Sequence, residues 1–584
     1  MPLPSGVETN WSCFAEPYSE NSAIVIAGGS ILSISPSILF VDLNIACVAD
    51  RILRCVDAKE MRKRGVANQA HLCKTKTSLD PSLKQLLLIS ISALSLCTAV
   101  HAIVQPHALF SDHAVLQQNV KVPVWGTASE GEKVTVEFQG QTLSTVAKNG
   151  RWQVVLPPLQ PGGPFTLTIV GENRIVVQDV LVGEVWICGG QSNMARPLGL
   201  HPPLQPLVNW EQEAASANYP QMRHFAINRS ASDTPQADVK GKWEVCSPRT
   251  APQFTAIGYY FGRDLTRKLN LPVGLINNAV PGTPAEAWTS PETLRSVPEF
   301  KTILERHAEA VQKWDPAKAE EDYKKALEKF HVAEAAAKQA GKPVPPPPGK
   351  AQDPKGHKRP GGLYNGMVHP LQPYAIRGVI WYQGENNNDR AKEYQTLFPA
   401  MIADWRRTMA QGDFPFLFVQ LAPFQKIGPE IREAQLMTWQ KTPHTAMVVT
   451  VDCGDAKDIH PTRKEPVGAR LALAARALAY GEKLEYSGPV FAAMKVNDSR
   501  ALLTFTHAAN GLTSKGGPLK GFTVAGADKR FVPAEARIEG SSVVVTSPEV
   551  IAPVAVRYGW EKVPDVNLFN QEGLPASPFR TDTE

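Results

Sequence analysis

Cysteine is scarce in this chain, with 8 cysteines among 584 residues. Only Cys188, Cys246 and Cys453 follow residue 102, and an odd number leaves room for one disulfide at most. Cys246 with Cys453 is one option for a pair, and three buried free thiols are the other. The early cysteines have no spacing typical of metal ligands: Cys13, Cys47 and Cys55. The composition therefore excludes a small fold that depends on a disulfide framework.

Net charge is also low for this length. Lys and Arg number 61 against 56 Asp and Glu, which gives a formal charge of +5. The charges are spread along the chain without a basic stripe, so nucleic acid is not expected as a partner.

Long apolar runs are missing as well. The run at residues 86–97 is shorter than the about 20 residues that a membrane-spanning helix needs.

That short apolar run has the form of a secretory signal. Lys84 precedes it, and the small residues Val100 and Ala102 follow it in the order of a cleavage site. We expect cleavage after Ala102, a secreted or periplasmic protein, and no membrane anchor after cleavage; a buried core helix is the alternative. Because a signal peptide begins a chain, Met61 is a natural start, and residues 1–60 are interpreted as an overextended reading frame without function.

The length predicts two or three domains. Residues 103–180 alternate apolar and polar residues between glycine-rich turns, which predicts an antiparallel β-sandwich that serves packing or holds sugar. Residues 181–483 alternate strand and helix patterns, which predicts an α/β domain with a parallel sheet and its site at the carboxyl ends of the strands. Residues 484–584 return to strand patterns and predict a second β-module.

One segment interrupts the α/β pattern. Residues 300–342 are rich in Ala, Lys and Glu, and a proline-rich stretch follows at 343–349. The pattern predicts a helical hairpin followed by an extended spacer. We expect an insertion at 300–360 that flanks the cleft as a cap.

The stretch at residues 182–194 is the best candidate for chemistry. An apolar strand pattern at 185–188 stops at two glycines, and Gln-Ser-Asn follows. Such a turn holds the hydroxyl and the backbone N–H of Ser192 clear of the sheet. The alternative is an ordinary turn in which Ser192 caps the next helix. The motif is not the G-x-S-x-G of a nucleophile elbow.

Serine needs a base, because its hydroxyl is a weak nucleophile at neutral pH. His460 comes just after the strand pattern that ends near residue 452, and Asp458 or Asp455 lies within reach to orient its imidazole. Taken alone, a histidine before proline is more often a turn residue.

A developing oxyanion needs hydrogen-bond donors. Asn387 follows the strand pattern that ends at Tyr382, and Gly282 follows another strand pattern at 271–278. We expect the Asn387 amide to point into the cleft and Gly282 to offer its backbone N–H. Four turns that carry a nucleophile, a glycine donor, an amide donor and a histidine, each after a strand, are unlikely together by chance.

The sequence resembles the SGNH hydrolases, and in particular the sialate O-acetylesterases and similar bacterial acetylesterases. The motifs that carry the resemblance are GGQSNM at 189–194, GTPAEAW at 282–288, WYQGENN at 381–387 and DIHPTRKEPVGARLA at 458–472. The resemblance covers roughly residues 105–580. It implies a flavodoxin-like three-layer α/β/α SGNH hydrolase domain with flanking β-sandwich modules, and ester hydrolysis without metal or cofactor.

The resemblance also implies roles for single residues. Ser192 is the nucleophile, His460 the base and Asp458 the candidate third member, while the Ser192 N–H, Gly282 and Asn387 form the oxyanion hole. Substrate-binding candidates are Gln191, Gln383, Glu385 and Arg432, with Arg196 as a second arginine for a sugar carboxylate.

Two positions depart from the family pattern. Relatives often have glycine where this chain has Pro281, and an acid three residues before the histidine, where this chain has Lys457. The third member is therefore Asp458, Asp455, a backbone carbonyl or absent. The sequence predicts an esterase that removes O-acetyl groups from sialic acid, or from a glycan such as xylan. A non-catalytic carbohydrate-binding protein on a decayed esterase fold is the contrasting hypothesis.

Overall fold

The computed structural model describes residues 23–27, 30–34 and 103–583. The chain divides into two compact units, residues 1–99 and 100–584. In the first unit, β1 (Ala23–Ala27) and β2 (Ser30–Ile34) pair as an antiparallel hairpin. The predicted signal peptide and its cleavage site, residues 84–102, lie outside the described residues.

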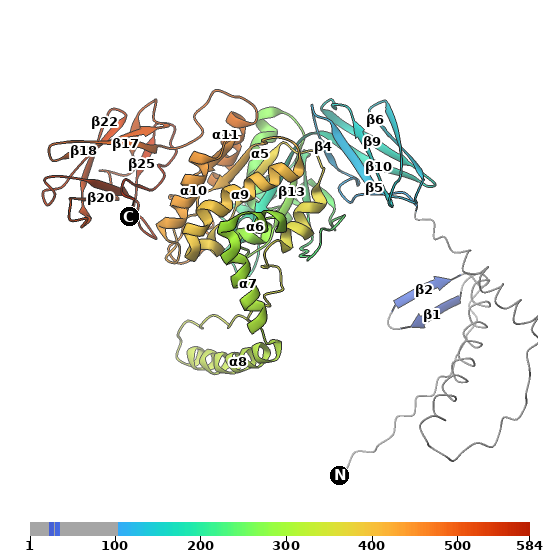
Figure 1. Ribbon diagram of the computed structural model, residues 1–584, viewed down its shortest axis with the longest axis horizontal. Helices are drawn as coiled ribbons and strands as arrows, with labels where there is room; N and C mark the ends of the chain where they lie inside the picture. Colours follow the sequence, from blue (N-terminus) through green and yellow to red (C-terminus); the bar gives the residue numbers. More distant parts are fainter. Residues whose placement is uncertain (1–22, 28–29, 35–102, 584) are drawn as a thin grey trace, which may run out of the picture. The chain divides into compact units, whose positions relative to one another are not determined.

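A mostly parallel sheet forms the centre of the second unit (Figure 1), in the order β12-β11-β13-β10-β14-β15-β16. β10 pairs in parallel with β13 on one side and with β14 on the other, and only the edge strand β12 is antiparallel to its neighbour. The predicted α/β class is confirmed. The strands are β10 (Arg174–Gly190), β11 (Tyr219–Ala226), β12 (Trp243–Cys246), β13 (Val273–Ala279), β14 (Gly378–Tyr382), β15 (Phe416–Val419) and β16 (Thr445–Val448).

Helices cover both faces of this sheet. Trp186 of β10 packs edge-on against Phe261 of α5 (Ala256–Leu269). Gly189 points to the opposite face, because side chains alternate along a strand. Its neighbour in register, Trp381, packs against Trp405 of α9 (Ala391–Met409) on that face. α11 (Glu465–Leu478) packs on α5, and α10 (Pro429–Lys441) packs on α9.

β10 joins the central sheet to the β-rich region before it. Its first half pairs antiparallel with β9 (Gly162–Val170), and its second half runs in the parallel sheet. The boundary that the sequence placed between residues 180 and 181 therefore falls inside one continuous strand.

The β-rich region also contains a three-stranded sheet in the order β3-β5-β8: β3 (Gln105–Pro106), β5 (Val122–Thr127) and β8 (Arg151–Leu156). Its remaining strands are β4 (Val115–Gln117), β6 (Lys133–Phe138) and β7 (Gln141–Val146).

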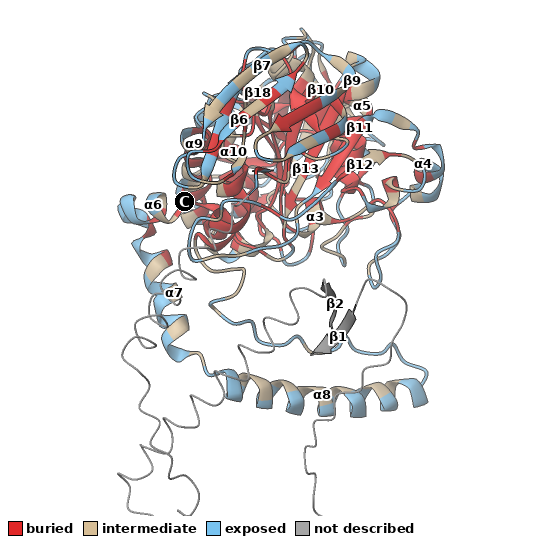
Figure 2. Ribbon diagram, turned by 90° about the vertical axis from the view of Figure 1, so that its right-hand side faces the viewer, coloured by how far each residue is buried: buried red, intermediate tan, exposed pale blue. Residues whose placement is uncertain are grey.

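The inserted segment is helical as predicted, but it is not a hairpin. α7 (Lys301–Lys313) and α8 (Pro316–Gln339) meet at a wide angle (Figure 1). Asp315 caps α8 by accepting hydrogen bonds from two backbone N–H groups, and Pro316 occupies its first position, so a new helix starts in a new direction. α8 has no buried residue (Figure 2).

The C-terminal region is β-rich and has a hydrophobic core of its own, which includes Leu503, Val556, Tyr558 and Phe579. One antiparallel sheet has the order β17-β18-β23-β22. Another has the order β21-β20-β24-β26, with β20 (Phe522–Ala525), β21 (Val532–Pro533), β24 (Ala555–Tyr558) and β26 (Phe579–Arg580). Their longest strands are β17 (Val490–Asn497), β18 (Arg500–Thr506), β22 (Glu535–Glu539) and β23 (Ser542–Thr546). Across the described part of the chain, no helix is both long enough and apolar enough to cross a membrane.

Candidate active site

The serine turn lies at the carboxyl end of the central strand. β10 ends at Gly190, whose φ of 130° and whose contact with Tyr382 require glycine: a Cβ here would lie 2.1 Å from the Tyr382 carbonyl oxygen. Ser192 then opens the short helix α3 (Ser192–Ala195), so its backbone N–H has no acceptor within the helix. The turn therefore presents a hydroxyl and a hydrogen-bond donor at the same edge of the sheet.

The predicted nucleophile and base meet in the structure. His460, in the loop between β16 and α11, places its Nε2 2.9 Å from the Ser192 Oγ. Burial lowers the pKa of His460 below its usual value, Asp458 opposes this shift, and the nearby cations Lys464 and Arg196 add to it. A neutral imidazole at hydrogen-bond distance from a hydroxyl can accept its proton.

Of the two candidate carboxylates, Asp458 lies beside the imidazole. Its Oδ1 is 3.6 Å from the His460 Nδ1 and accepts a 2.8 Å hydrogen bond from the His460 backbone N–H. Asp455 instead accepts from the backbone N–H groups of Lys457 and Asp458 at 2.7 and 3.1 Å. Asp455 therefore shapes the loop, and Asp458 is the carboxylate placed to orient the base.

Arg196 also fixes the histidine loop. It is 3% exposed, and its Nη1 donates a 2.8 Å hydrogen bond to the backbone carbonyl of His460. Its Nη2 donates to the carbonyl of Gln205. With these partners the guanidinium holds the base in place and is not available for a sugar carboxylate.

The turn after β13 offers a backbone donor at Gly282. This glycine has a φ of 69°, and its N–H makes no hydrogen bond to any described residue. The adjoining Thr283 is held in place, because its hydroxyl donates to Val280 and its carbonyl accepts from the Gln383 side chain. The prediction for Gly282 as a donor is compatible with this geometry.

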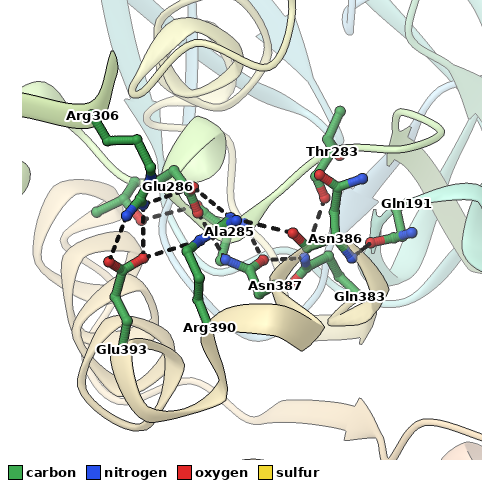
Figure 3. A network of polar contacts seen from close by, with 11 residues as sticks. Gln191, Thr283, Ala285, Glu286, Arg306, Gln383, Asn386, Asn387, Arg390 and Glu393 are labelled. Carbon is green, nitrogen blue, oxygen red and sulfur yellow. Dashed lines mark hydrogen bonds and ion pairs between the residues drawn. The ribbon is translucent and has the colours of Figure 1, made fainter. Parts of the chain in front are cut away.

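The prediction that the Asn387 amide points into the cleft is wrong. Asn387 is fully buried, and Figure 3 shows its amide inside a polar network. Its Nδ2 donates to the Glu286 carboxylate at 2.8 Å, and its Oδ1 accepts from Ala285 N and Gln383 Nε2 at 2.9 and 2.7 Å. Asn387 therefore fixes the loop that carries Gly282. Asn386, half-buried, donates its backbone N–H to Gln191 Oε1.

The same network extends to the inserted helix α7 (Figure 3). Arg390 donates to the Glu286 Oε1 at 3.1 Å, and Arg306 of α7 lies 3.8 Å from that oxygen. Arg306 also makes two hydrogen bonds, of 3.0 and 3.1 Å, to the carboxylate of Glu393. Arg306 of the insertion thus lies beside the Glu286 carboxylate. Glu286 in turn accepts a hydrogen bond from Asn387, which fixes the loop that carries Gly282.

The predicted substrate-binding role of Gln383 does not fit its environment. Gln383 is fully buried, donates to Thr283 O and Asn387 Oδ1, and accepts from the Tyr394 hydroxyl. Gln191 is 3% exposed and holds the β14 turn through the Asn386 N–H. Both glutamines therefore brace the turns of the site.

Sequence reasoning missed two polar residues beside the serine. Asn193 donates to the Glu385 Oε1 at 2.7 Å and to the Ile459 carbonyl at 3.0 Å, so it joins the serine turn to the loop after β14 and to the histidine loop. Lys464, 1% exposed, donates to the Asn193 side chain, and burial lowers its pKa to about 7. Both residues lie within the motifs that carry the resemblance. Burial also raises the pKa of Glu385, whose Oε2 is buried without a partner in the described residues.

Arg432 is not a substrate-binding residue. It is fully buried on α10, and burial lowers its pKa to about 10. Its guanidinium donates only to backbone carbonyls, those of Leu421, Ala422, Glu561 and Lys562. Two of these lie in the C-terminal region, so Arg432 ties that region to the α/β core.

A lysine from the inserted segment lies beside the Gly282 turn. The Lys358 Nζ is 3.9 Å from the position of a Cβ built on Gly282. Lys358 is half-buried, burial lowers its pKa, and no described residue forms an ion pair with it. Arg229 and Lys358 both lower the pKa of neighbouring His357, after the larger effect of burial. This side of the Gly282 turn is therefore positively charged.

Cys188, Cys246 and Cys453 are buried free thiols, which confirms that option over a disulfide. No group of three or more His, Cys, Asp or Glu that could hold a metal ion occurs among the residues with described positions.

Comparisons with known proteins find carbohydrate acetylesterases. The family model "Carbohydrate esterase, sialic acid-specific acetylesterase" matches residues 182–330 and 353–477. Sialate O-acetylesterase from Mus musculus is 31% identical over 511 residues, covering 78% of this chain and 90% of the mouse protein. The Rattus norvegicus enzyme is 33% identical over 428 residues, covering 66% and 75%. The crystal structure of a carbohydrate acetylesterase from Xanthomonas citri has a TM-score of 0.70 at 38% identity, covering 82% of this chain and 100% of that chain.

Proposed function

Because this chain belongs to the family of sialic acid-specific carbohydrate acetylesterases, and is therefore a carboxylic ester hydrolase, we propose that it removes O-acetyl groups from sialic acid through an acetyl-enzyme intermediate. The observation that carries the proposal is the 2.9 Å distance between the Ser192 Oγ and the His460 Nε2. Secretion or export to the periplasm is part of the proposal, and the mature protein should begin at Ile103 on N-terminal sequencing.

The reaction needs only groups of this chain and water. The Ser192 Oγ attacks the acetyl carbonyl while His460 takes the hydroxyl proton. The imidazolium then gives that proton to the departing sugar oxygen, which leaves the acetyl group on Ser192. Water, deprotonated by His460, attacks the acetyl-enzyme, and acetate departs as the proton returns to Ser192. Asp458 stabilises the imidazolium in both halves.

The oxyanion hole consists of the backbone N–H groups of Ser192 and Gly282 in this proposal. Each donor is worth about 3 kcal/mol in a preorganised site. Asn387 acts through the Gly282 loop, as a positioning residue, since its amide already bonds Glu286, Ala285 and Gln383. Pro281 is no obstacle in this arrangement, because the donor is the residue after it.

We further propose that residues 181–483 form the three-layer α/β/α domain of the SGNH hydrolases. The β-modules are residues 103–180 and 484–584, and residues 1–102 are an extension with a signal peptide. Support comes from α5 and α9, which lie on opposite faces of the central sheet, and from the separate hydrophobic core of the C-terminal region.

Lys358 favours sialic acid over a neutral glycan such as xylan. Sialic acid carries a carboxylate, whereas acetylated xylose units are neutral. The Lys358 ammonium group is half-buried beside the Gly282 turn and forms no ion pair with a described residue. The carboxylate of sialic acid can form a charge-assisted hydrogen bond with it, whereas a neutral glycan cannot. Arg229, whose charge lowers the pKa of the neighbouring His357, adds to the attraction.

Acetate release from acetylated mucin and acetylated xylan tests this choice. The protein should hydrolyse the mucin esters faster, and Lys358→Gln should raise KM about tenfold on mucin, equivalent to about 1.4 kcal/mol, without changing KM on xylan. Lys355→Gln removes the same charge at an exposed position of the same segment and serves as the control. Faster release from xylan, or equal effects of the two substitutions, would contradict the assignment of sialic acid.

The pH profile reports on Asp458. The activity requires neutral His460, so it rises with pH through the pKa of that group, which lies below the usual value for histidine. Asp458 raises this pKa by favouring the imidazolium. Asp458→Asn should therefore move the acidic limb of kcat/KM to lower pH and also reduce the plateau, because the base loses its orienting partner. A limb that stays in place or moves to higher pH would contradict this role of Asp458.

A further inference from the structure

We propose that the N-terminal β-rich region holds a second glycan-binding site, distant from Ser192, in a groove beside the sheet β3-β5-β8. A cavity of about 580 Å³ opens there, a volume typical of ligand sites. Its floor and walls include Trp125, Arg151 and Gln153 of the sheet, and Asp238 and His369 from two later segments. None of its lining residues belongs to the proposed catalytic machinery.

The register of the sheet places an aromatic ring among polar side chains. Trp125 of β5 lies opposite Gln153 of β8, and Thr127 lies opposite Arg151. Side chains alternate along a strand, so these four residues share one face. Trp152, between Arg151 and Gln153, points to the other face and is 2% exposed. The face towards the cavity therefore carries one tryptophan flanked by hydrogen-bonding groups.

Trp125 is held firmly but remains partly exposed. Phe110 meets its ring edge-on with centroids 4.9 Å apart, and His107 lies against it at 4.8 Å. An immobilised indole is suited to the C–H face of a pyranose ring, because it offers apolar area at little cost in side-chain entropy.

Free polar groups surround this ring. Arg151, Gln153 and Gln105 are exposed, and their side chains form no hydrogen bond or ion pair with any described residue. On another wall, the Asp238 carboxylate lies 3.0 Å from the His107 Nε2. Amides, a guanidinium and a carboxylate together provide donors and acceptors for neighbouring sugar hydroxyls. The ligand that fits this chemistry is the saccharide chain of a glycan.

The groove lies far from the reacting serine. Tyr374, whose ring is 6.2 Å from that of Trp125, donates a hydrogen bond to the carbonyl of Val115. Val115 pairs with Leu181 of β10, and the strand from Leu181 to Gly190 spans about 30 Å. The site therefore holds a part of the glycan that is not being deacetylated, and it raises the effective concentration of ester groups near Ser192.

Affinity electrophoresis in gels that contain fully deacetylated xylan or deacetylated mucin tests the site without any ester being present. The full chain should be retarded by at least one of these glycans, and Arg151→Ala/Gln153→Ala should weaken that retardation at least fivefold. Arg174→Ala, an exposed substitution in the same region but outside the groove, should leave it unchanged. Hydrolysis of 4-nitrophenyl acetate should be equal in all three proteins.

The outcomes separate this site from the proposed esterase function. Unretarded migration of the full chain, or equal retardation of the groove variant, would overturn the second site and leave the esterase proposal intact. Loss of nitrophenyl acetate hydrolysis in the groove variant would also overturn it, since the substitution would then act on the fold or on the catalytic site. Trp125→Ala provides a second test: binding should be lost while the thermal midpoint shows whether the sheet still folds.

Discussion

Replacing Ser192 by alanine is expected to lower kcat/KM for 4-nitrophenyl acetate at least a thousandfold. The Ser192 hydroxyl lies 2.9 Å from the His460 Nε2, and the proposed acetyl-enzyme cannot form without it. Removing the nucleophile of a serine–histidine pair leaves only the modest catalysis that donors and binding supply. The activated ester is a suitable probe because it does not depend on recognition of the sugar.

The control for this substitution is Ser230→Ala, which removes a hydroxyl from an exposed loop. Both variants should unfold at nearly the same temperature as the original protein, because Ser192 makes its only described side-chain hydrogen bond to His460. Equal hydrolysis by the Ser192→Ala variant and the original protein would instead favour the hypothesis of a non-catalytic carbohydrate-binding protein.

The sequence was sufficient to predict that the serine and histidine loops meet at one edge of the sheet. Gln191-Ser192 follows the end of β10, and Asp452-Cys453-Gly454 comes shortly after β16. Both stretches combine a buried apolar run with turn residues, and parallel strands bring such ends to one edge. Ser192 and His460 are 268 positions apart and still meet, because both follow strands of the same sheet. The order of the motifs therefore carried three-dimensional information.

The sequence could not show which polar residues are already used by the fold. Asn387 and Gln383 have the residue types and the position of catalytic groups, but their partners Ala285 and Thr283 lie 102 and 100 positions away. A buried amide that braces a loop and an amide that faces the substrate have the same local pattern. Only the hydrogen bonds distinguish them.

The sequence predicted helices well where their apolar periodicity is strong. It predicted poorly the angle between two helices and the course of a strand that belongs to two sheets. α5 and α9 lie within residues 181–483, where the sequence predicts alternating strands and helices. The angle between α7 and α8 depends on the three residues from Trp314 to Pro316. Apolar periodicity does not predict the direction in which the second helix starts. β10 likewise continues through the expected domain boundary because one strand can serve two sheets.

Replacing Arg432 by methionine is expected to destabilise the protein by roughly 4 kcal/mol, without changing KM on either acetylated glycan. Methionine keeps much of the apolar volume but removes the guanidinium donor from four carbonyls, two of which belong to the buried residues Leu421 and Ala422. Each charge-assisted hydrogen bond is worth about 2 kcal/mol before relaxation, and part of the loss is offset because the Lys562 carbonyl also accepts from the Phe424 N–H.

Urea unfolding followed by tryptophan fluorescence measures the effect of Arg432→Met, and Lys441→Met, at an exposed position of the same helix, is the matched control. The expected loss follows from the connection that Arg432 makes between α10 and residues 561–562, so limited proteolysis should also release the C-terminal region earlier in this variant. If Arg432→Met were as stable as Lys441→Met but bound anionic substrate tenfold more weakly, Arg432 would hold the sugar carboxylate after all.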